Sequence, residues 1–245
     1  MWLILAFCSA ALLGFYDVCK KHALSGNAVL PVLFLNTAIC SLLFLPFIIL
    51  SSYTGLLNST TFYVEPCGWE QHRYILLKAC IVLSSWIFGY FAMKHLPITI
   101  VGPINATRPV MVLVGAMLVF GERLNVWQWA GVTLAIISFF LIKRSGKKEG
   151  VDFRHNKWIF SLILAAVLGA VSGLYDKYLM APPESGGVGL SRMVVQSWYN
   201  LYQLAMMGLT MLMIWWPTRK NSTPFTWKWS IIFISLFLSA ADFVY

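Results

Sequence analysis

Long apolar stretches alternate with short polar breaks along the whole chain. A helix rises 1.5 Å per residue, so about 20 apolar residues cross a hydrocarbon core of roughly 30 Å. Stretches of about this length cover residues 2–18, 29–50, 74–93, 98–120, 126–142, 158–180 and 193–216, and an eighth begins near residue 229. The pattern predicts an all-α polytopic membrane protein, a bundle of about eight transmembrane helices.

One pair of these stretches forms a helical hairpin. Only the polar residues 121–125 separate stretch 98–120 from stretch 126–142, which leaves room for an antiparallel return and little else. The first stretch is unusual, because it carries Asn105, Arg108 and Pro109. The second carries no charged residue before it ends in Lys143-Arg144, which we expect at a membrane interface.

The chain contains an internal repeat. The sequence Gly14-Phe15-Tyr16-Asp17 in the first stretch returns as Gly173-Leu174-Tyr175-Asp176 in the sixth, and Asn36 in the second matches Asn200 in the seventh. The second copy therefore begins after five spans, and an odd number of spans inverts it. Inverted-topology repeats are typical of secondary transporters. We expect a first repeat over 1–144, a basic linker over 145–157 and an incomplete second repeat over 158–245.

The residues from Phe120 to Val132, read as Phe-Gly-Glu-Arg-Leu-Asn-Val-Trp-Gln-Trp-Ala-Gly-Val, carry a family signal. They resemble the end of an EamA-like repeat of the drug/metabolite transporter superfamily, where two helices flank a Gly-Glu turn followed by an aromatic residue or Gln and then Gly. The resemblance implies a permease that moves a small metabolite through a central cavity by alternating access. A second Gly-Glu hairpin does not follow, so we expect a fragment of a ten-span protein.

Composition and charge agree with this interpretation. The chain is 59% hydrophobic and 11% charged, against about a quarter charged in soluble domains. Its net charge of +9 lies in the polar breaks rather than on a hydrated face, which argues against a nucleic-acid partner. The positive-inside rule places the 143–157 linker in the cytoplasm and the N-terminus outside. We expect a multi-pass protein of the plasma (inner) membrane.

Amide side chains mark one face of the seventh stretch. Gln196, Asn200 and Gln203 recur at i, i+4 and i+7, so they share a face. Amides facing lipid would be costly, and we expect this face to point into the bundle. There the amides would either join helices or line a substrate path, and the sequence leaves both open. Asn36 joins the set because the repeat pairs it with Asn200.

Charged and aromatic residues within the spans complete the candidate site. Asn105 and Arg108 share a face near the bilayer centre, where an arginine needs a neutralising partner. Asp17, Asp176 and Asp242 are the candidates, for this role and for ion coupling. Interfacial pairing with a nearby lysine is the alternative for the first two. Trp86 and Tyr90 would add an aromatic lining, with plain packing as the alternative.

No enzymatic constellation is present. The chain has no Gly-rich phosphate loop, no H-E-x-x-H and no G-x-S-x-G, and its cysteines and histidines are too scattered for a metal site. We expect no cofactor. The expected partners are the lipid bilayer, a small-molecule substrate and, as an option, further copies of the chain. The alternatives are a membrane-embedded enzyme acting on a lipid-linked substrate, with Asp17 or His95 as acid/base, and a non-transporting scaffold.

Overall fold

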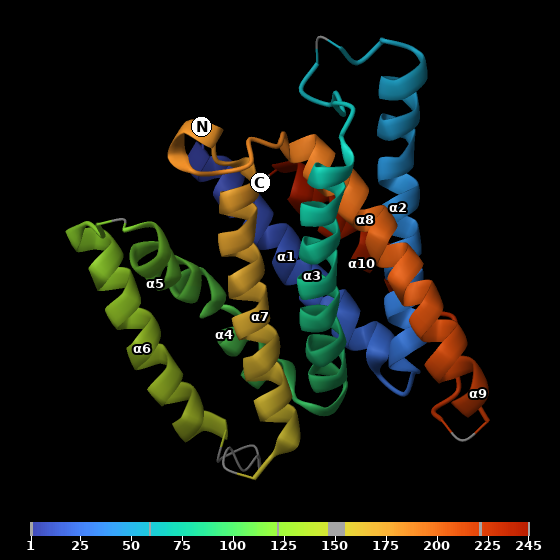
Figure 1. The fold of residues 1–245 in the computed structure, drawn as a ribbon. Helices are drawn as coiled ribbons and strands as arrows, with labels where there is room; N and C mark the ends of the chain where they lie inside the picture. The colour runs from blue at the N-terminus through green and yellow to red at the C-terminus, as the bar shows by residue number, and fades with distance from the viewer. Residues whose placement is uncertain (1, 59, 122, 147–154, 221, 245) are drawn as a thin grey trace. The chain divides into compact units, whose positions relative to one another are not determined.

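The computed structural model describes residues 2–58, 60–121, 123–146, 155–220 and 222–244, and within these ranges the regular structure is entirely helical (Figure 1). This confirms the all-α prediction. The long helices are α1 (Trp2–Leu24), α2 (Val29–Tyr53), α3 (Trp69–His95), α4 (Ile98–Asn105), α5 (Arg108–Phe120), α6 (Val126–Gly146), α7 (Lys157–Met180), α8 (Arg192–Thr210) and α10 (Ser230–Val244). Shorter pieces are a 3₁₀ turn (Pro183–Ser185), a π-helical turn (Met211–Trp215) and α9 (Trp216–Thr218).

The helices coincide with the spans expected from hydropathy. Among the described residues, four segments are long and apolar enough to cross a membrane: α2, α3, α4 with α5, and α7. The apolar helix α10 is shorter. The protein is therefore an integral, multi-pass helical membrane protein.

The fourth span differs from the expectation of one continuous helix. It breaks at Ala106–Thr107 into α4 and α5. The Thr107 N–H donates to the Ile104 carbonyl at 3.2 Å, which tightens the chain into a single turn. Pro109 then lies in the first turn of α5. Backbone N–H groups in a first turn make no bond within the helix, so proline costs no hydrogen bond there. The break leaves Asn105 at the end of α4 and Arg108 at the start of α5.

The turn between α5 and α6 explains the residues of the family signal. Gly121 ends α5 in the left-handed region with φ of 66°, a conformation that glycine adopts without steric cost. Asn125 and Gln128 then cap α6 reciprocally. Each backbone N–H donates to the other side chain at 2.8 Å, as in a capping box. Glu122 of the Gly-Glu pair lies outside the described residues.

The chain divides into two compact units. Unit 1 comprises residues 1–80 and 179–245, and unit 2 comprises residues 81–178. In unit 1, α1 packs along α10, and α2 packs against both α8 and α10. The side chains at these contacts form most of the buried core of the unit, including Leu24, Leu33, Phe44, Met207, Ile231 and Ile234.

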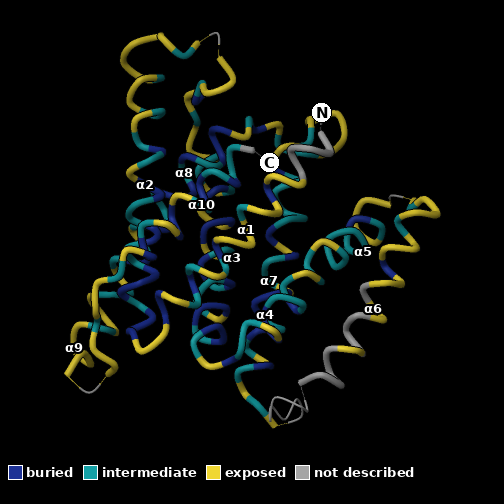
Figure 2. Tube along the Cα trace, turned by 180° about the vertical axis from the view of Figure 1, so that it is seen from behind, coloured by how far each residue is buried: buried dark blue, intermediate teal, exposed yellow. Residues whose placement is uncertain are grey.

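Unit 2 is built on the second part of α3 and on α7. The Ser85 hydroxyl donates to the Ala165 carbonyl at 2.7 Å, and the Ser161 hydroxyl donates to the Phe88 carbonyl at 3.0 Å. The helix α6 packs against α4 and α5, and its described side chains are mostly exposed (Figure 2). Exposed apolar side chains such as Trp127 and Leu134 suit contact with lipid tails. These packing units do not test the division into repeats near residue 144, which stays a prediction.

Candidate substrate site

The polar face of α8 lies inside unit 1, as its helical spacing predicted. Asn200 and Gln203 are buried, with exposed fractions of 2% and 0%. Asn200 is satisfied locally, because its Nδ2 donates to the Gln196 main-chain carbonyl at 2.9 Å; its own main-chain carbonyl accepts from the Ser41 hydroxyl of α2 at 2.8 Å. Gln203 differs. Neither atom of its amide has a hydrogen-bond partner among the described residues.

Gln196 connects α8 to the acidic residue of α10. Its Nε2 donates to the Asp242 carboxylate, and the Tyr199 hydroxyl lies 3.4 Å from the same nitrogen. Arg192, one turn earlier on α8, donates to the Asp242 main-chain carbonyl. Asp242 therefore contacts two of the polar residues that face α10 from α8. Its role in ion coupling stays a prediction.

Lys78 is a further candidate for the site, and the sequence analysis did not include it. It lies within α3 in unit 1, is buried with 6% of its surface exposed, and places its Nζ 4.5 Å from the centre of the Tyr199 ring. An ionisable side chain inside a span marks a functional position by default. That signal was available, because Lys78 is the one lysine of the stretch 74–93.

Asn36 belongs to a polar seam between α2 and α10. It is fully buried, and its Oδ1 accepts from the Ser235 hydroxyl at 3.0 Å. Cys40 and Ser239 continue the seam one turn along, with their side-chain atoms 3.6 Å apart. The Asn36 Nδ2 has no hydrogen-bond partner among the described residues. The Asn36 Oδ1 thus joins α2 to α10, and the Nδ2 is available to donate a hydrogen bond to a ligand or water.

Asn105 and Arg108 flank the helix break in unit 2. The Arg108 side chain packs on α7, because a Cβ built on Gly169 would lie 3.2 Å from its Cζ and Nε. The Asn105 Oδ1 is buried and has no hydrogen-bond partner among the described residues. Because this pair belongs to unit 2 and the α8 face to unit 1, their expected shared cavity stays a prediction.

The aromatic candidates lie on the same helix, α3. Tyr90 is fully buried, whereas Trp86 is half-buried. Gly89 lies between them, and a Cβ there would meet the Ala165 Cβ at 3.6 Å, so α3 and α7 run close together beside these rings. This setting fits packing as well as lining, and their substrate role stays a prediction.

The remaining acidic candidates divide between the units. Asp17 lies in unit 1, 3.8 Å from the Lys20 ammonium, which also sits 4.8 Å from the centre of the Tyr16 ring. This is the lysine pairing weighed as the alternative to ion coupling. Asp176 lies in unit 2 and is half-buried.

His95, the acid/base candidate of the enzyme alternative, is exposed in unit 2. Its ring stacks on Trp158 with centroids 3.7 Å apart, and its Nδ1 lies 2.8 Å from the Phe91 carbonyl. Asp17, the other acid/base candidate, lies in unit 1.

Comparison with known proteins gives one match. The family model of the EamA-like transporter family covers residues 1–144, which is more than half of the chain. No curated protein and no solved structure matches. The matched range includes the helix break and the capped turn between α5 and α6, and it ends at the residue where the first repeat was expected to end. The chain belongs to the EamA-like transporter family, and the predicted resemblance is confirmed.

Proposed function

We propose that this protein is a secondary transporter of the plasma (inner) membrane that moves a small metabolite with an acidic group by alternating access. Membership of a transporter family supports the general activity. A gradient of protons or of a counter-substrate would drive it, since the sequence has no phosphate-binding loop. The candidate substrate contacts are the polar face of α8 in unit 1 and the residues at the break between α4 and α5 in unit 2.

The observation that carries this proposal is the buried amide of Gln203. A buried polar group without a partner costs about 1–3 kcal/mol. A residue that only joined helices would have its partner in place, as the Asn36 Oδ1 has in the Ser235 hydroxyl of α10. A substrate or water in a path along α8 would supply the missing hydrogen bonds of Gln203, and of the Asn36 Nδ2 on the neighbouring helix.

Arg108 supports the preference for an acidic group. A guanidinium keeps its charge in any protein setting, so it cannot escape burial by losing a proton. It begins a helix directly after a break, beside the buried and unsatisfied Oδ1 of Asn105. Irregular backbone at membrane depth is tolerated where it lines a cavity or is buried in protein. Arg108 with Asn105 would therefore bind the acidic part of the substrate.

Gln203→Leu separates a substrate path from helix joining. We expect this variant to lose at least tenfold in transport while its stability stays equal or rises, because the leucine removes an unsatisfied amide from the core. The assay is uptake into proteoliposomes of a panel of labelled monocarboxylates and their neutral amides. Thr210→Val is the control, since it removes a hydroxyl of α8 that already donates to the Met206 carbonyl at 2.9 Å. A destabilised Gln203→Leu that still transports would contradict the proposal.

Arg108→Met tests the acidic preference in the same assay. We expect it to abolish uptake of the carboxylates, and Arg108→Lys to weaken uptake because the planar fork is lost while the charge remains. Arg123→Met is the control, as Arg123 is exposed in the turn before α6. Normal uptake by Arg108→Met would show that the site assignment is wrong. Absence of transport in the unmodified chain for the whole panel would favour a scaffold.

A further inference from the structure

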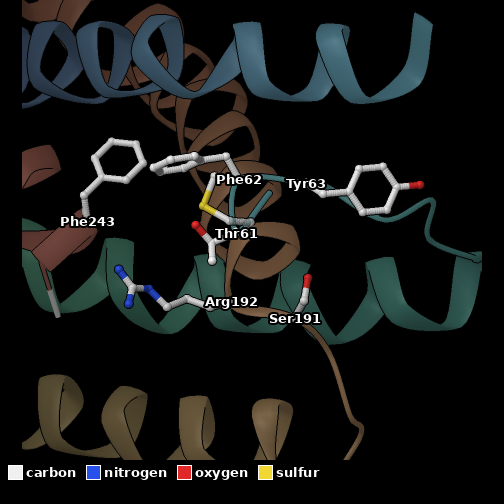
Figure 3. A pocket seen from close by; sticks show the side chains of 7 residues that line it. Thr61, Phe62, Tyr63, Ser191, Arg192 and Phe243 are labelled. Atoms are coloured by element: carbon white, nitrogen blue, oxygen red, sulfur yellow. The ribbon is translucent and has the colours of Figure 1, made fainter. Parts of the chain in front are cut away.

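Unit 1 contains a cavity of about 310 Å³ at one end of its helices (Figure 3). Three separate segments line it: loop residues 61–63, the start of α8 at residues 191–193, and Phe243 of α10. The volume is at the small end of the range of ligand pockets, which is roughly 300–1,000 Å³.

All three segments fall on the same side of the membrane. The distribution of lysine and arginine among the breaks places the loops 51–73 and 181–191 and the end of the last span opposite the basic linker. The cavity therefore opens toward the non-cytoplasmic side. It is made where the longest loop between described helices meets the outer ends of α8 and α10.

The polar side of the cavity suits an anion. Among the described lining residues, Arg192 carries the one formal charge at neutral pH, and a hydrogen bond to the Asp242 carbonyl positions its guanidinium. The Ser191 hydroxyl is buried and has no hydrogen-bond partner among the described residues. Both residues begin α8, so the positive end of its helix dipole adds to the charge. The Asp242 carboxylate is not among the lining residues, and it accepts a hydrogen bond from the Gln196 amide.

The other side of the cavity is aromatic. The rings of Phe62 and Phe243 meet edge to face with centroids 6.0 Å apart, and Phe47 of α2 stacks on Phe62 at 5.6 Å. In Figure 3 the guanidinium of Arg192 lies below the rings of Phe62 and Phe243, toward the same end of the view, whereas the ring of Tyr63 points toward the opposite end. One small molecule could thus contact a cation and an aromatic surface together.

We propose that this cavity is an outer binding site for a small amphipathic anion, a carboxylate on an aromatic or branched apolar body. The claim that the cavity binds this anion does not depend on the proposed function. The further claim that a transported substrate binds here first does rest on it. From Arg192 the polar residues Gln196, Tyr199 and Gln203 continue along α8 for about 16 Å at 1.5 Å per residue. Lys78, beside Tyr199, supplies a second cation deeper on the same route.

The test measures binding of three probes that share one body. Benzoate, benzamide and benzylamine are titrated by calorimetry into the full chain in phosphatidylcholine nanodiscs. We expect benzoate to bind at least tenfold more tightly than benzamide, and benzylamine not to bind, because Arg192 attracts one charge and repels the other. Equal binding of benzoate and benzylamine would overturn the proposal.

Variants assign the binding to this cavity. We expect Arg192→Gln to weaken benzoate binding at least tenfold and Arg192→Lys to weaken it less than threefold. Arg219→Gln is the matched control, because that arginine lies over Trp216 after the π-helical turn, far along the chain from the cavity. Titrating these variants in the Arg108→Met background removes any binding at that arginine, so the remaining benzoate binding reports the cavity. Unchanged binding by Arg192→Gln would exclude the site, whatever the transport assays show.

A lipid headgroup could offer the same negative charge. Repeating the titration in nanodiscs with phosphatidylglycerol distinguishes the two sources. We expect benzoate binding to persist within threefold, and its loss would show that the cavity takes an anionic lipid rather than a small molecule.

Sidedness is tested by labelling at the cavity rim. Thr61→Cys is combined with Cys67→Ser, which removes the loop's own thiol; burial, followed by the charge of Glu65, raises the pKa of that thiol. We expect a membrane-impermeant methanethiosulfonate to modify Cys at position 61 from outside intact cells, and benzoate to slow the reaction. Modification only after permeabilisation would contradict an outward opening.

Discussion

The helices α1 and α7 carry the same sequence motif but have different neighbours. On α7, the glycines at 169 and 173 are covered by α5, since a Cβ at Gly169 would lie 3.2 Å from the Arg108 guanidinium carbon and one at Gly173 would lie 3.1 Å from a methyl of Val112. On α1, a Cβ at Gly14, the repeat partner of Gly173, would meet nothing within 4 Å among the described residues. On α7 the two glycines form a notch that the side chains of Arg108 and Val112 fill, whereas on α1 the corresponding notch at Gly14 is open.

The tyrosines of the motif, Tyr16 and Tyr175, also have different neighbours. Tyr16 on α1 is buried beneath the Lys20 ammonium, whereas Tyr175 on α7 stacks on Tyr178 with ring centroids 5.9 Å apart. Small residues spaced by four, Ala10 and Gly14 on α1 and Gly169 and Gly173 on α7, let another helix approach closely in lipid. The motif therefore provides a surface for packing, and the neighbouring helix decides whether that surface is used. In α7 it is used to seat an arginine within a span.

Gly169→Leu should have the largest effect among substitutions at these notches. The new side chain would displace Arg108, and overpacking typically costs about 1–3 kcal/mol, of which the better helix propensity of leucine returns up to about 1. We expect a net loss of about 1–2 kcal/mol in unfolding free energy, together with impaired transport. Thermal unfolding in detergent and proteoliposome uptake measure the two effects.

Val167→Leu is the control for that substitution, because Val167 is exposed on the same helix. If Gly169→Leu matched this control in stability and transport, Arg108 would not depend on the notch.

A double-mutant cycle between Gly173 and Val112 isolates a smaller effect. Gly173→Ala alone combines a close contact with a gain in helix propensity, and these terms oppose each other. Combining it with Val112→Ala removes the contact but keeps the propensity, so the cycle reports the contact itself. We expect a coupling free energy of about 1 kcal/mol from unfolding titrations. A value near zero would mean that the two helices separate at this level.

The contrast also separates what the sequence could predict from what it could not. Span positions follow from hydropathy, because covering the backbone in lipid requires long apolar helices. The inward direction of the α8 amides followed from their spacing, and their burial confirms it. The break at Ala106–Thr107 was missed, because the periodicity of a 23-residue apolar segment hides one tight turn. Sequence spacing orders residues along one helix and cannot show which helix lies opposite.

Lys78 and Gln203 illustrate the same limit. The sequence ranked Gln203 with Gln196 and Asn200 as equals, yet only packing reveals that Asn200 is satisfied and Gln203 is not. Lys78 gained meaning once Tyr199 was seen beside it. Partners that are distant in sequence therefore decide which polar residue in a span is structural and which is a candidate for binding.

Gly14→Leu should have the smallest effect and is the sharpest test of the open face. A Cβ there meets no described atom, so the leucine side chain would extend into lipid. Lipid tails are as apolar as leucine, so this exposure costs little free energy. The substitution exchanges the helix-weakening glycine for a good helix former, worth up to about 1 kcal/mol. We expect unfolding free energy to stay equal or to rise slightly, with transport unchanged. A loss as large as that of Gly169→Leu would show that a further helix covers α1, and the two notches would then be equivalent.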